Sequence, residues 1–232
     1  MISFFNRHKR SIFIGTTVTF LAGVFVGLGA YVGDQRSYND VAKVGEVSIP
    51  YAAYIKNVNR ALSGLRDKGL DVPEALQKQL EGQILQEMII EEALSQLAQE
   101  HGLRVTDLEI AADVQSIPVF MREGVFNPMI YRQVLWRQLK LKPAEYEEQR
   151  RKSRLAMKFR QLAMSAAKVS PAEVKEAYLA QGKKEKDFVK EEPQAMRELL
   201  QFKAAGILES YLKQFLSTHE VKNFLEDRQK GV

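Results

Sequence analysis

The residue types that could perform acid–base or metal chemistry are sparse in this 232-residue chain and are poorly spaced for it. None of the three histidines, His8, His101 and His219, has a metal-ligating residue three or four positions further along. His101 and His219 fall at the ends of predicted helices, where the helix dipole favours a protonated imidazole. The chain has no cysteine, which excludes a thiolate nucleophile and a cysteine-ligated metal. We therefore expect no metal site.

Acidic residues form three short clusters: Glu91-Glu92, Glu145 with Glu147 and Glu148, and Glu191-Glu192. Lys, Arg or Gln residues interleave each cluster, which is typical of a solvated helix surface. Paired catalytic carboxylates would instead be expected in an apolar pocket. The chain also lacks a glycine-rich phosphate loop, a G-x-S-x-G motif and an H-E-x-x-H motif. The sequence thus favours a protein without enzymatic activity, catalytic residues or a cofactor.

Large apolar side chains gather in the middle of the chain, where they could form a binding surface. The candidates are Phe120, Met121, Phe126, Met129 and Trp136. They flank a Gly and a Pro at which the helical pattern breaks, and segments at such breaks are often exposed. Two interpretations stay open: a core between helices, or an exposed groove in which flexible methionines adapt to varied partners. We favour Phe126 and Trp136 as core and Phe120 and Met121 as surface.

Much of the excess of basic over acidic residues lies at the start of the chain. Three of the 34 basic residues, Arg7, Lys9 and Arg10, precede a long apolar run, and the rest of the chain has 31 basic against 29 acidic residues. Binding to nucleic acid would need basic residues concentrated on one face. Because Lys and Arg alternate with Glu along the predicted helices, we expect no nucleic-acid partner.

The apolar run itself predicts a membrane anchor over residues 12–33. Residues 12–32 carry no charge, and as a helix they would extend roughly 31 Å at about 1.5 Å per residue, enough to cross the hydrocarbon core. The basic flank then predicts a cytoplasmic N-terminus and an exported remainder, by the positive-inside rule. A cleavable signal peptide is the alternative, although its apolar region is usually shorter.

Capping signals divide the exported part into helices, so the expected fold is all-α with a minor β hairpin. Alternating apolar and polar residues around Gly45 predict that hairpin over residues 41–49. Thr106 and Ser170 each precede a Glu by three positions, which is the capping-box pattern. The predicted helices cover residues 50–67, 71–100, 106–117, 127–140, 143–168, 170–182 and 193–218. A charged, structure-poor junction is expected at 183–192.

The order of these signals resembles the N-terminal chaperone module of SurA and PpiD, periplasmic folding factors associated with parvulin isomerases. The resemblance runs from about Val41 to Gln181. It is carried by Val41-Ala-Lys-Val-Gly-Glu-Val-Ser-Ile-Pro, Gln83-Ile-Leu-Gln-Glu-Met-Ile-Ile-Glu-Glu-Ala-Leu, His101-Gly-Leu-Arg-Val-Thr-Asp-Leu-Glu-Ile, Leu141-Lys-Pro-Ala-Glu-Tyr-Glu-Glu-Gln-Arg and Val169-Ser-Pro-Ala-Glu-Val. The ordered set is more specific than any single motif, and the anchor makes the PpiD-like branch the closer one.

The resemblance implies how the chain is divided and which domains of the family's proteins it contains. The family usually continues into isomerase domains, but only about 50 residues follow Gln181, too few for that fold. The last helix is instead similar to the helix that completes the chaperone module. The implied parts are a cytoplasmic tail (1–11), an anchor (12–33), a chaperone domain (34–182), a charged junction (183–192) and a completing helix with its tail (193–232).

The function implied by the resemblance is that of a holdase, tethered to the bacterial inner membrane with its main domain in the periplasm. Its partners would be unfolded or nascent exported polypeptides, with the protein-export translocon as a further candidate. Binding would be non-covalent, through apolar surface. The alternative is a structural adaptor for one membrane or translocon partner. A peptidyl-prolyl isomerase fits less well, because no isomerase domain fits in the chain.

Overall fold

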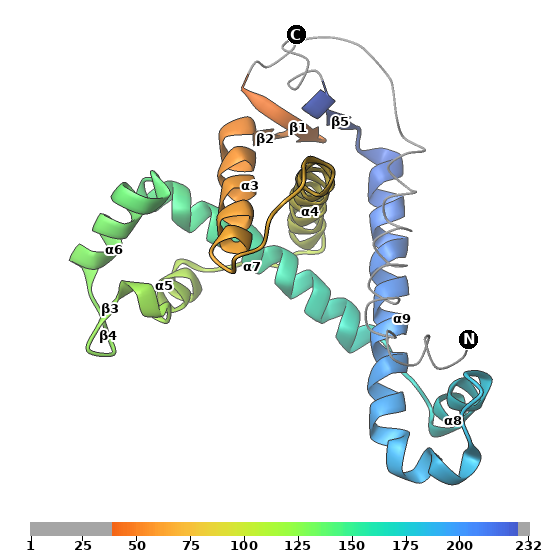
Figure 1. Ribbon diagram of the computed structural model, residues 1–232. Coiled ribbons are helices and arrows are strands. Elements are labelled where there is room, and N and C mark those ends of the chain that lie inside the picture. The colour runs from red at the N-terminus through yellow and green to blue at the C-terminus, as the bar shows by residue number, and fades with distance from the viewer. Residues whose placement is uncertain (1–38, 227–232) are drawn as a thin grey trace. The chain divides into compact units, whose positions relative to one another are not determined.

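The computed structural model describes residues 39–226, which form a mainly helical fold with a few short strands (Figure 1). These residues divide into two compact units. The first unit holds residues 39–43, 47–87 and 222–226, and the second holds residues 44–46 and 88–221. The predicted anchor at residues 12–33 lies outside the described residues. Within residues 39–226, no helix is both long and apolar enough to cross a bilayer.

The first unit begins with most of the two strands of the predicted hairpin. Strands β1 (Asp40–Val44) and β2 (Val47–Pro50) flank a turn in which Gly45 has a φ of +56°, a conformation that glycine adopts without steric cost. A third short strand from the end of the chain, β5 (Val221–Asn223), completes a sheet of order β2-β1-β5. We did not predict β5, because three residues carry too little pattern to identify a strand.

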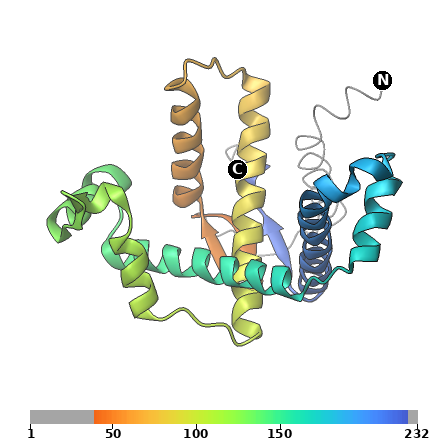
Figure 2. The ribbon, with the colours of Figure 1, turned by 90° about the horizontal axis from the view of Figure 1, so that it is seen from below.

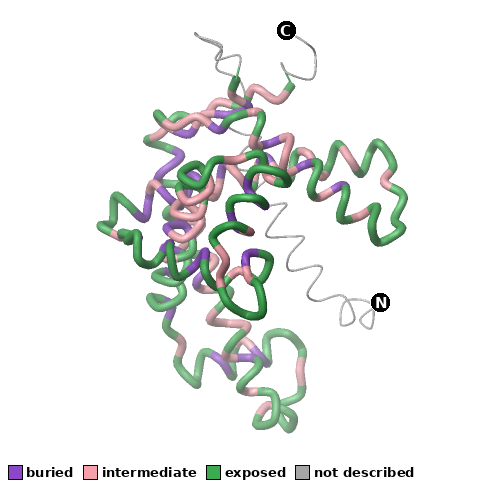
Figure 3. Tube along the Cα trace, turned by 90° about the vertical axis from the view of Figure 1, so that its left-hand side faces the viewer, coloured by how far each residue is buried: buried purple, intermediate pink, exposed green. Residues whose placement is uncertain are grey.

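Helices follow the hairpin directly. Helix α3 (Tyr51–Arg66) buries Tyr54, Val58 and Leu62, which recur every four residues along one face. Helix α4 (Glu74–Glu100) contributes its first half to this unit, and the Tyr54 hydroxyl donates a hydrogen bond to the carbonyl of Glu81 at 3.3 Å. The burial pattern in Figure 3 shows buried and exposed positions alternating along the helices. Each helix therefore turns one face to the core.

The second unit begins with the other half of α4 and then α5 (Asp107–Gln115). The predicted capping box at the start of α5 is present: the Thr106 side chain accepts from the backbone N–H of Glu109, and the Glu109 carboxylate accepts from the backbone N–H of Thr106. A 3₁₀ turn, η1 (Pro118–Phe120), and the hairpin of β3 (Met121–Arg122) and β4 (Val125–Phe126) come next. They lead into α6 (Pro128–Val134) and a π-helical turn, η2 (Leu135–Leu139). We call residues 118–139 the central lobe.

Helix α7 (Pro143–Ala166) packs against both α5 and α9 (Figure 1). Rings from three helices meet near its C-terminal half: the Phe159 ring lies 5.4 Å from that of His101 and 5.4 Å from that of Tyr211, between ring centroids. The His101 ring also contacts the Tyr211 ring edge-on at 5.2 Å. His101 thus serves as a packing residue at the end of α4.

Helix α8 (Pro171–Ala180) lies beside the first half of α9 (Phe188–Thr218), as Figure 2 shows. The predicted capping box at Ser170 is present. Val174 and Tyr178 of α8 are buried with Ala195 of α9.

The predicted junction at 183–192 is not free of structure, so that prediction was wrong in its secondary structure. A 3₁₀ turn covers Glu185–Asp187, and α9 begins at Phe188 rather than at Pro193. The Phe188 ring packs edge-on against the buried Tyr178 ring at 5.3 Å, which stabilises an earlier helix start. Pro193 lies within the first two turns of α9 and leaves the helix without one backbone N–H donor. The division of the chain into domains stays a prediction.

Candidate functional site

The β3–β4 hairpin orients the first of the candidate binding residues. Glu123 and Gly124 have φ values of +54° and +79°, as a two-residue hairpin turn with two left-handed positions requires. Met121 pairs with Phe126, and Arg122 pairs with Val125. Since side chains alternate along a strand, the two pairs point to opposite faces. Arg122 and Val125 are exposed, whereas Met121 and Phe126 are half-buried.

Phe120 forms the core of the central lobe, although we had favoured it as a surface residue. Only 1% of its side chain is exposed. Its ring meets Tyr131 and Tyr146 edge-on, at 5.0 Å and 5.8 Å between centroids. The 3₁₀ turn and the hairpin fold Phe120 beneath these rings, so it offers no surface to a partner.

The hydroxyl of Tyr131 ties the lobe to α7. It donates a hydrogen bond of 3.0 Å to the carboxylate of Glu147. Burial of Tyr131, and then this hydrogen bond and the charge of Glu147, raise the pKa of the tyrosine well above its usual value. Tyr131 is therefore a neutral donor that holds α6 against the start of α7.

The outward face of α6 and η2 carries the most exposed of the candidates. Met129 is 69% exposed and Trp136 is 71% exposed, so our assignment of Trp136 to the core was wrong. The two are seven residues apart, which places them on one side of a helix, opposite the buried Tyr131, Val134 and Leu135. Arg132 lies between them, and its Nη2 donates to the Met129 sulfur at 3.3 Å. We call Met129, Arg132, Gln133 and Trp136 the outer stripe.

Other exposed side chains around the outer stripe were not among our candidates. Val119 and Val125 are more than half exposed. Arg122 and Arg137 are exposed as well. The helical phase of residues 128–139 could have identified the outward face from the sequence. The exposure of Val119 and Val125 depends on a turn and a hairpin that periodicity does not reveal.

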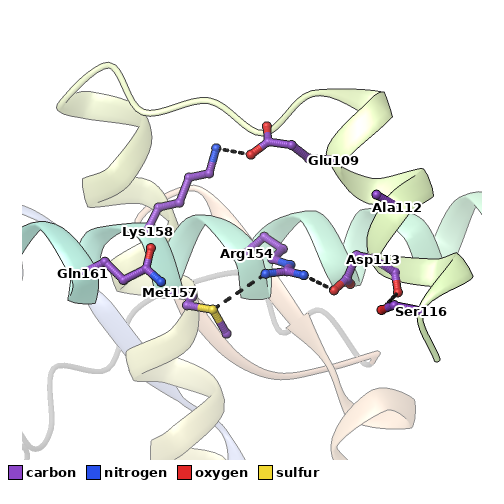
Figure 4. Close-up of a pocket in the computed structure, with 8 residues that line it drawn as sticks. All are labelled: Glu109, Ala112, Asp113, Ser116, Arg154, Met157, Lys158 and Gln161. Carbon is purple, nitrogen blue, oxygen red and sulfur yellow. Dashed lines mark hydrogen bonds and ion pairs between the residues drawn. The ribbon is translucent and has the colours of Figure 1, made fainter. Parts of the chain in front are cut away.

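A cleft of about 400 Å³ between α5 and α7 is the second feature of the unit that could hold a ligand (Figure 4). Its charged side chains are paired. Asp113 is only 6% exposed and accepts from Arg150 Nε at 2.7 Å and from Arg154. Lys158 Nζ lies 2.6 Å from a carboxylate oxygen of Glu109. We call these two clusters of ion pairs the α5–α7 seam. The residues lining the cleft are Glu109, Ala112, Asp113, Ser116, Arg154, Met157, Lys158 and Gln161.

The pairing fixes the charge state of both carboxylates. Burial raises the pKa of Asp113, but the hydrogen bonds from Arg150 and Arg154 outweigh it and leave the pKa below its usual value. The hydrogen bonds from Lys158 and from the Thr106 backbone lower the pKa of Glu109 to about 2. Both groups therefore stay ionised near neutral pH and hold α5 on α7. A general acid or base would instead need a pKa near the working pH.

His219, the other histidine that the structure describes, also has a packing role. His219 stacks on Phe215, with ring centroids 4.0 Å apart, and its Nε2 lies 3.5 Å from a carboxylate oxygen of Glu100. No group of His, Cys, Asp and Glu side chains within residues 39–226 is arranged to hold a metal ion. Within the part of the chain that the structure describes, the outer stripe and the α5–α7 seam are therefore the two features considered for function.

Comparison with known proteins identifies the family. The model of the SurA-like N-terminal domain matches residues 1–162, which is more than half of the chain and ends within α7. No curated protein matches the chain. The helical fold, with its short opening hairpin, agrees with the fold that the resemblance implied. The chain therefore belongs to the family of SurA-like N-terminal domains, and this membership indicates a role of the chaperone type.

Proposed function

We propose that this protein is a membrane-tethered holdase that binds unfolded exported polypeptides through the outer stripe. The observation that carries the proposal is the exposure of Met129 and Trp136 on one face of the central lobe. Exposed large apolar side chains that lie together mark binding sites more often than scattered ones do. The flexible thioether of Met129 and the broad ring of Trp136 suit varied, weakly bound partners.

The proposed mechanism needs no catalysis. An unfolded segment lays its apolar side chains against Met129 and Trp136, which removes apolar surface of both partners from water. The charged residues around the stripe keep the complex soluble. Because binding is selective for the unfolded state, it delays aggregation in proportion to the occupancy of the site. Neither a cofactor nor a covalent step takes part.

The proposed location rests on the sequence. The uncharged run at 12–32 and its basic flank support an inner-membrane anchor with a cytoplasmic N-terminus, as in the PpiD-like branch of the family. Such a tether would raise the concentration of the outer stripe near a translocon exit. Protease added to spheroplasts should digest the domain after residue 34. Complete protection of the domain would contradict this topology.

The test of the binding function is the suppression of aggregation of an unfolded model client by the full chain. We expect Trp136→Ser and Met129→Ser to weaken suppression several-fold while leaving the melting temperature unchanged. The matched control is Phe202→Ser, which removes an aromatic side chain that is 62% exposed on α9, away from the lobe in sequence. Equal effects of Trp136→Ser and Phe202→Ser would contradict the proposal.

A further inference from the structure

The surface around the outer stripe is strongly biased in charge. Between residues 118 and 142 the chain has a single acidic residue, Glu123, at the tip of the hairpin. The same segment has five basic residues, all of them exposed. The rest of the chain is much closer to balance, since the whole chain has 34 basic and 29 acidic residues. The basic residues of the segment are Arg122, Arg132, Arg137, Lys140 and Lys142.

Three exposed arginines on and around the outer stripe have no acidic partner among the described residues. Among residues 39–226, no carboxylate forms an ion pair with Arg122, Arg132 or Arg137, and the one contact of the Arg132 guanidinium is the Met129 sulfur. Each of these charges is therefore available to a partner.

The acidic residues that follow in the chain are engaged elsewhere. Glu145 accepts from the backbone N–H of Lys142 at 3.0 Å. Glu147 accepts from Tyr131, and Glu148 lies 3.4 Å from the Arg151 guanidinium. None of these three carboxylates forms an ion pair with Arg122, Arg132 or Arg137.

Apolar and basic groups alternate along the outer stripe at a regular spacing. Met129 and Trp136 are seven helical residues apart, which is roughly 10 Å at about 1.5 Å per residue, and Arg132 lies between them. An unfolded chain in the polyproline II conformation rises about 3.1 Å per residue, with three residues per turn. Apolar side chains at positions i and i+3 of such a chain therefore lie on one side, about 9 Å apart. The residues between them point about 120° away from this side, so a long acidic side chain there would reach Arg132 from the flank of the outer stripe.

We propose that the outer stripe selects unfolded segments in which acidic residues lie between apolar ones. The inference rests on the proposed function and names the client class of the same surface. Charge complementarity favours an acidic segment over a neutral or basic one of equal hydrophobicity. The alternation of Met129, Arg132 and Trp136 fits a polypeptide better than an anionic bilayer, which would present a continuous apolar layer beneath a separate layer of charge.

The chain provides its own probe for the test. Trp136 is the only tryptophan, so the intrinsic tryptophan fluorescence of the full chain reports on the outer stripe alone. We would titrate the full chain in nanodiscs of zwitterionic lipid with three tryptophan-free peptides. The peptides have the same leucines at positions i and i+3 and differ only in the residues between, which are Glu, Gln or Lys.

The acidic peptide should shift Trp136 emission to the blue and bind about ten-fold more tightly than the basic one at low salt, with the difference shrinking in high salt. Arg132→Gln and Arg137→Gln should each weaken binding of the acidic peptide about two- to five-fold, the range of exposed ion pairs, without changing that of the neutral peptide. The control Arg160→Gln, at an exposed arginine of α7, should change neither affinity.

Equal affinity for the three peptides would overturn this inference and leave the proposed function standing. So would an equal effect of Arg132→Gln on the acidic and the neutral peptide. A blue shift in nanodiscs with anionic lipid, before any peptide is added, would show that the stripe docks on headgroups and would also overturn it. If no peptide changed Trp136 emission, both the inference and the proposed function would fail.

Discussion

The α5–α7 seam buries a charged side chain, whereas the outer stripe on α6 and η2 exposes apolar ones. At the seam the carboxylate of Asp113 is buried, with Arg150 and Arg154 folded over it. At the stripe Trp136 and Met129 face solvent, with Arg132 beside them. The two surfaces belong to the same compact unit, so the difference lies in their local design.

One compact unit can therefore have a well-defined helix packing and also a surface that binds partners. A buried, fully paired carboxylate contributes little net stability compared with an apolar pair, but it penalises any other arrangement of the helices. Exposed apolar side chains contribute little to folding and remain available to a partner. The residues of the α5–α7 seam thus fix the packing of the helices, and the residues of the outer stripe are left to bind a partner.

The largest expected effect tests whether the central lobe has a core of its own beneath the stripe. Phe120→Ala removes a ring that is 1% exposed and contacts Tyr131 and Tyr146. We expect it to lower the free energy of unfolding by about 3–5 kcal/mol, the range for a buried aromatic residue. Urea denaturation provides the measurement. A loss below about 1 kcal/mol would mean that Phe120 is not packed as the structure shows.

The next effect tests the seam. Asp113→Ala leaves Arg150 and Arg154 without their acidic partner. Because both arginines remain about a third exposed, at 34% and 37%, we expect a loss of about 2–3 kcal/mol, less than for a fully buried pair. The control is Asp107→Ala, which breaks the pair between Arg151 and a carboxylate that is 97% exposed and should cost about 0.5 kcal/mol or less. If the two variants lost similar amounts of unfolding free energy, the buried ion pairs of the seam would be no more important for stability than an exposed pair.

Acid provides a smaller perturbation of the same seam. The pKa of Glu109 is about 2 in the folded chain against an ordinary value of 4.5. The carboxylate of the folded state is therefore protonated at a lower pH than that of the unfolded state. The stabilisation is complete above about pH 4.5 and is lost as the pH falls toward 2. The melting temperature should therefore drop over this window. Glu109→Gln keeps the cap of α5 and should make the drop shallower, whereas an unchanged profile would show that the Lys158 pair contributes nothing.

The smallest expected effect on stability is at the outer stripe. Trp136→Ala should change the free energy of unfolding by about 0.5 kcal/mol or less, because the side chain is mostly exposed. The same variant should weaken protection of an unfolded client, which no buried residue can do without loss of stability. If protection and stability fell together, Trp136 would be a packing residue.

Local sequence signals were enough to predict most of the fold. The capping boxes at Thr106 and Ser170 and the prolines at the starts of α6 and α7 fix helix starts through contacts within one turn. The Gly45 hairpin is equally local. The early start of α9 depends on packing between Phe188 and Tyr178, ten residues apart, and the pairing of β5 depends on the far end of the chain. Such long-range contacts leave no local pattern.

The sequence identified one region rich in large apolar residues, but it did not predict which of them are exposed. The five candidates do lie together in the central lobe, yet Phe120 and Trp136 were assigned to the wrong sides. Trp136 is out of phase with Tyr131, Val134 and Leu135, so its exposure could have been read from the helical spacing. The burial of Phe120 could not, because it depends on how a 3₁₀ turn and a two-residue hairpin fold back on the lobe.

The most direct test of the account is site-specific photocrosslinking in intact membranes. A photoreactive residue would replace Met129 or Trp136 in the outer stripe, or the 62% exposed Phe202 on α9 as the reference. We predict crosslinks from positions 129 and 136 to many exported polypeptides, which disappear when export is blocked, and none above background from position 202. Crosslinks of equal yield from all three positions, or a single stoichiometric partner at 129 and 136, would contradict a holdase that binds through the outer stripe.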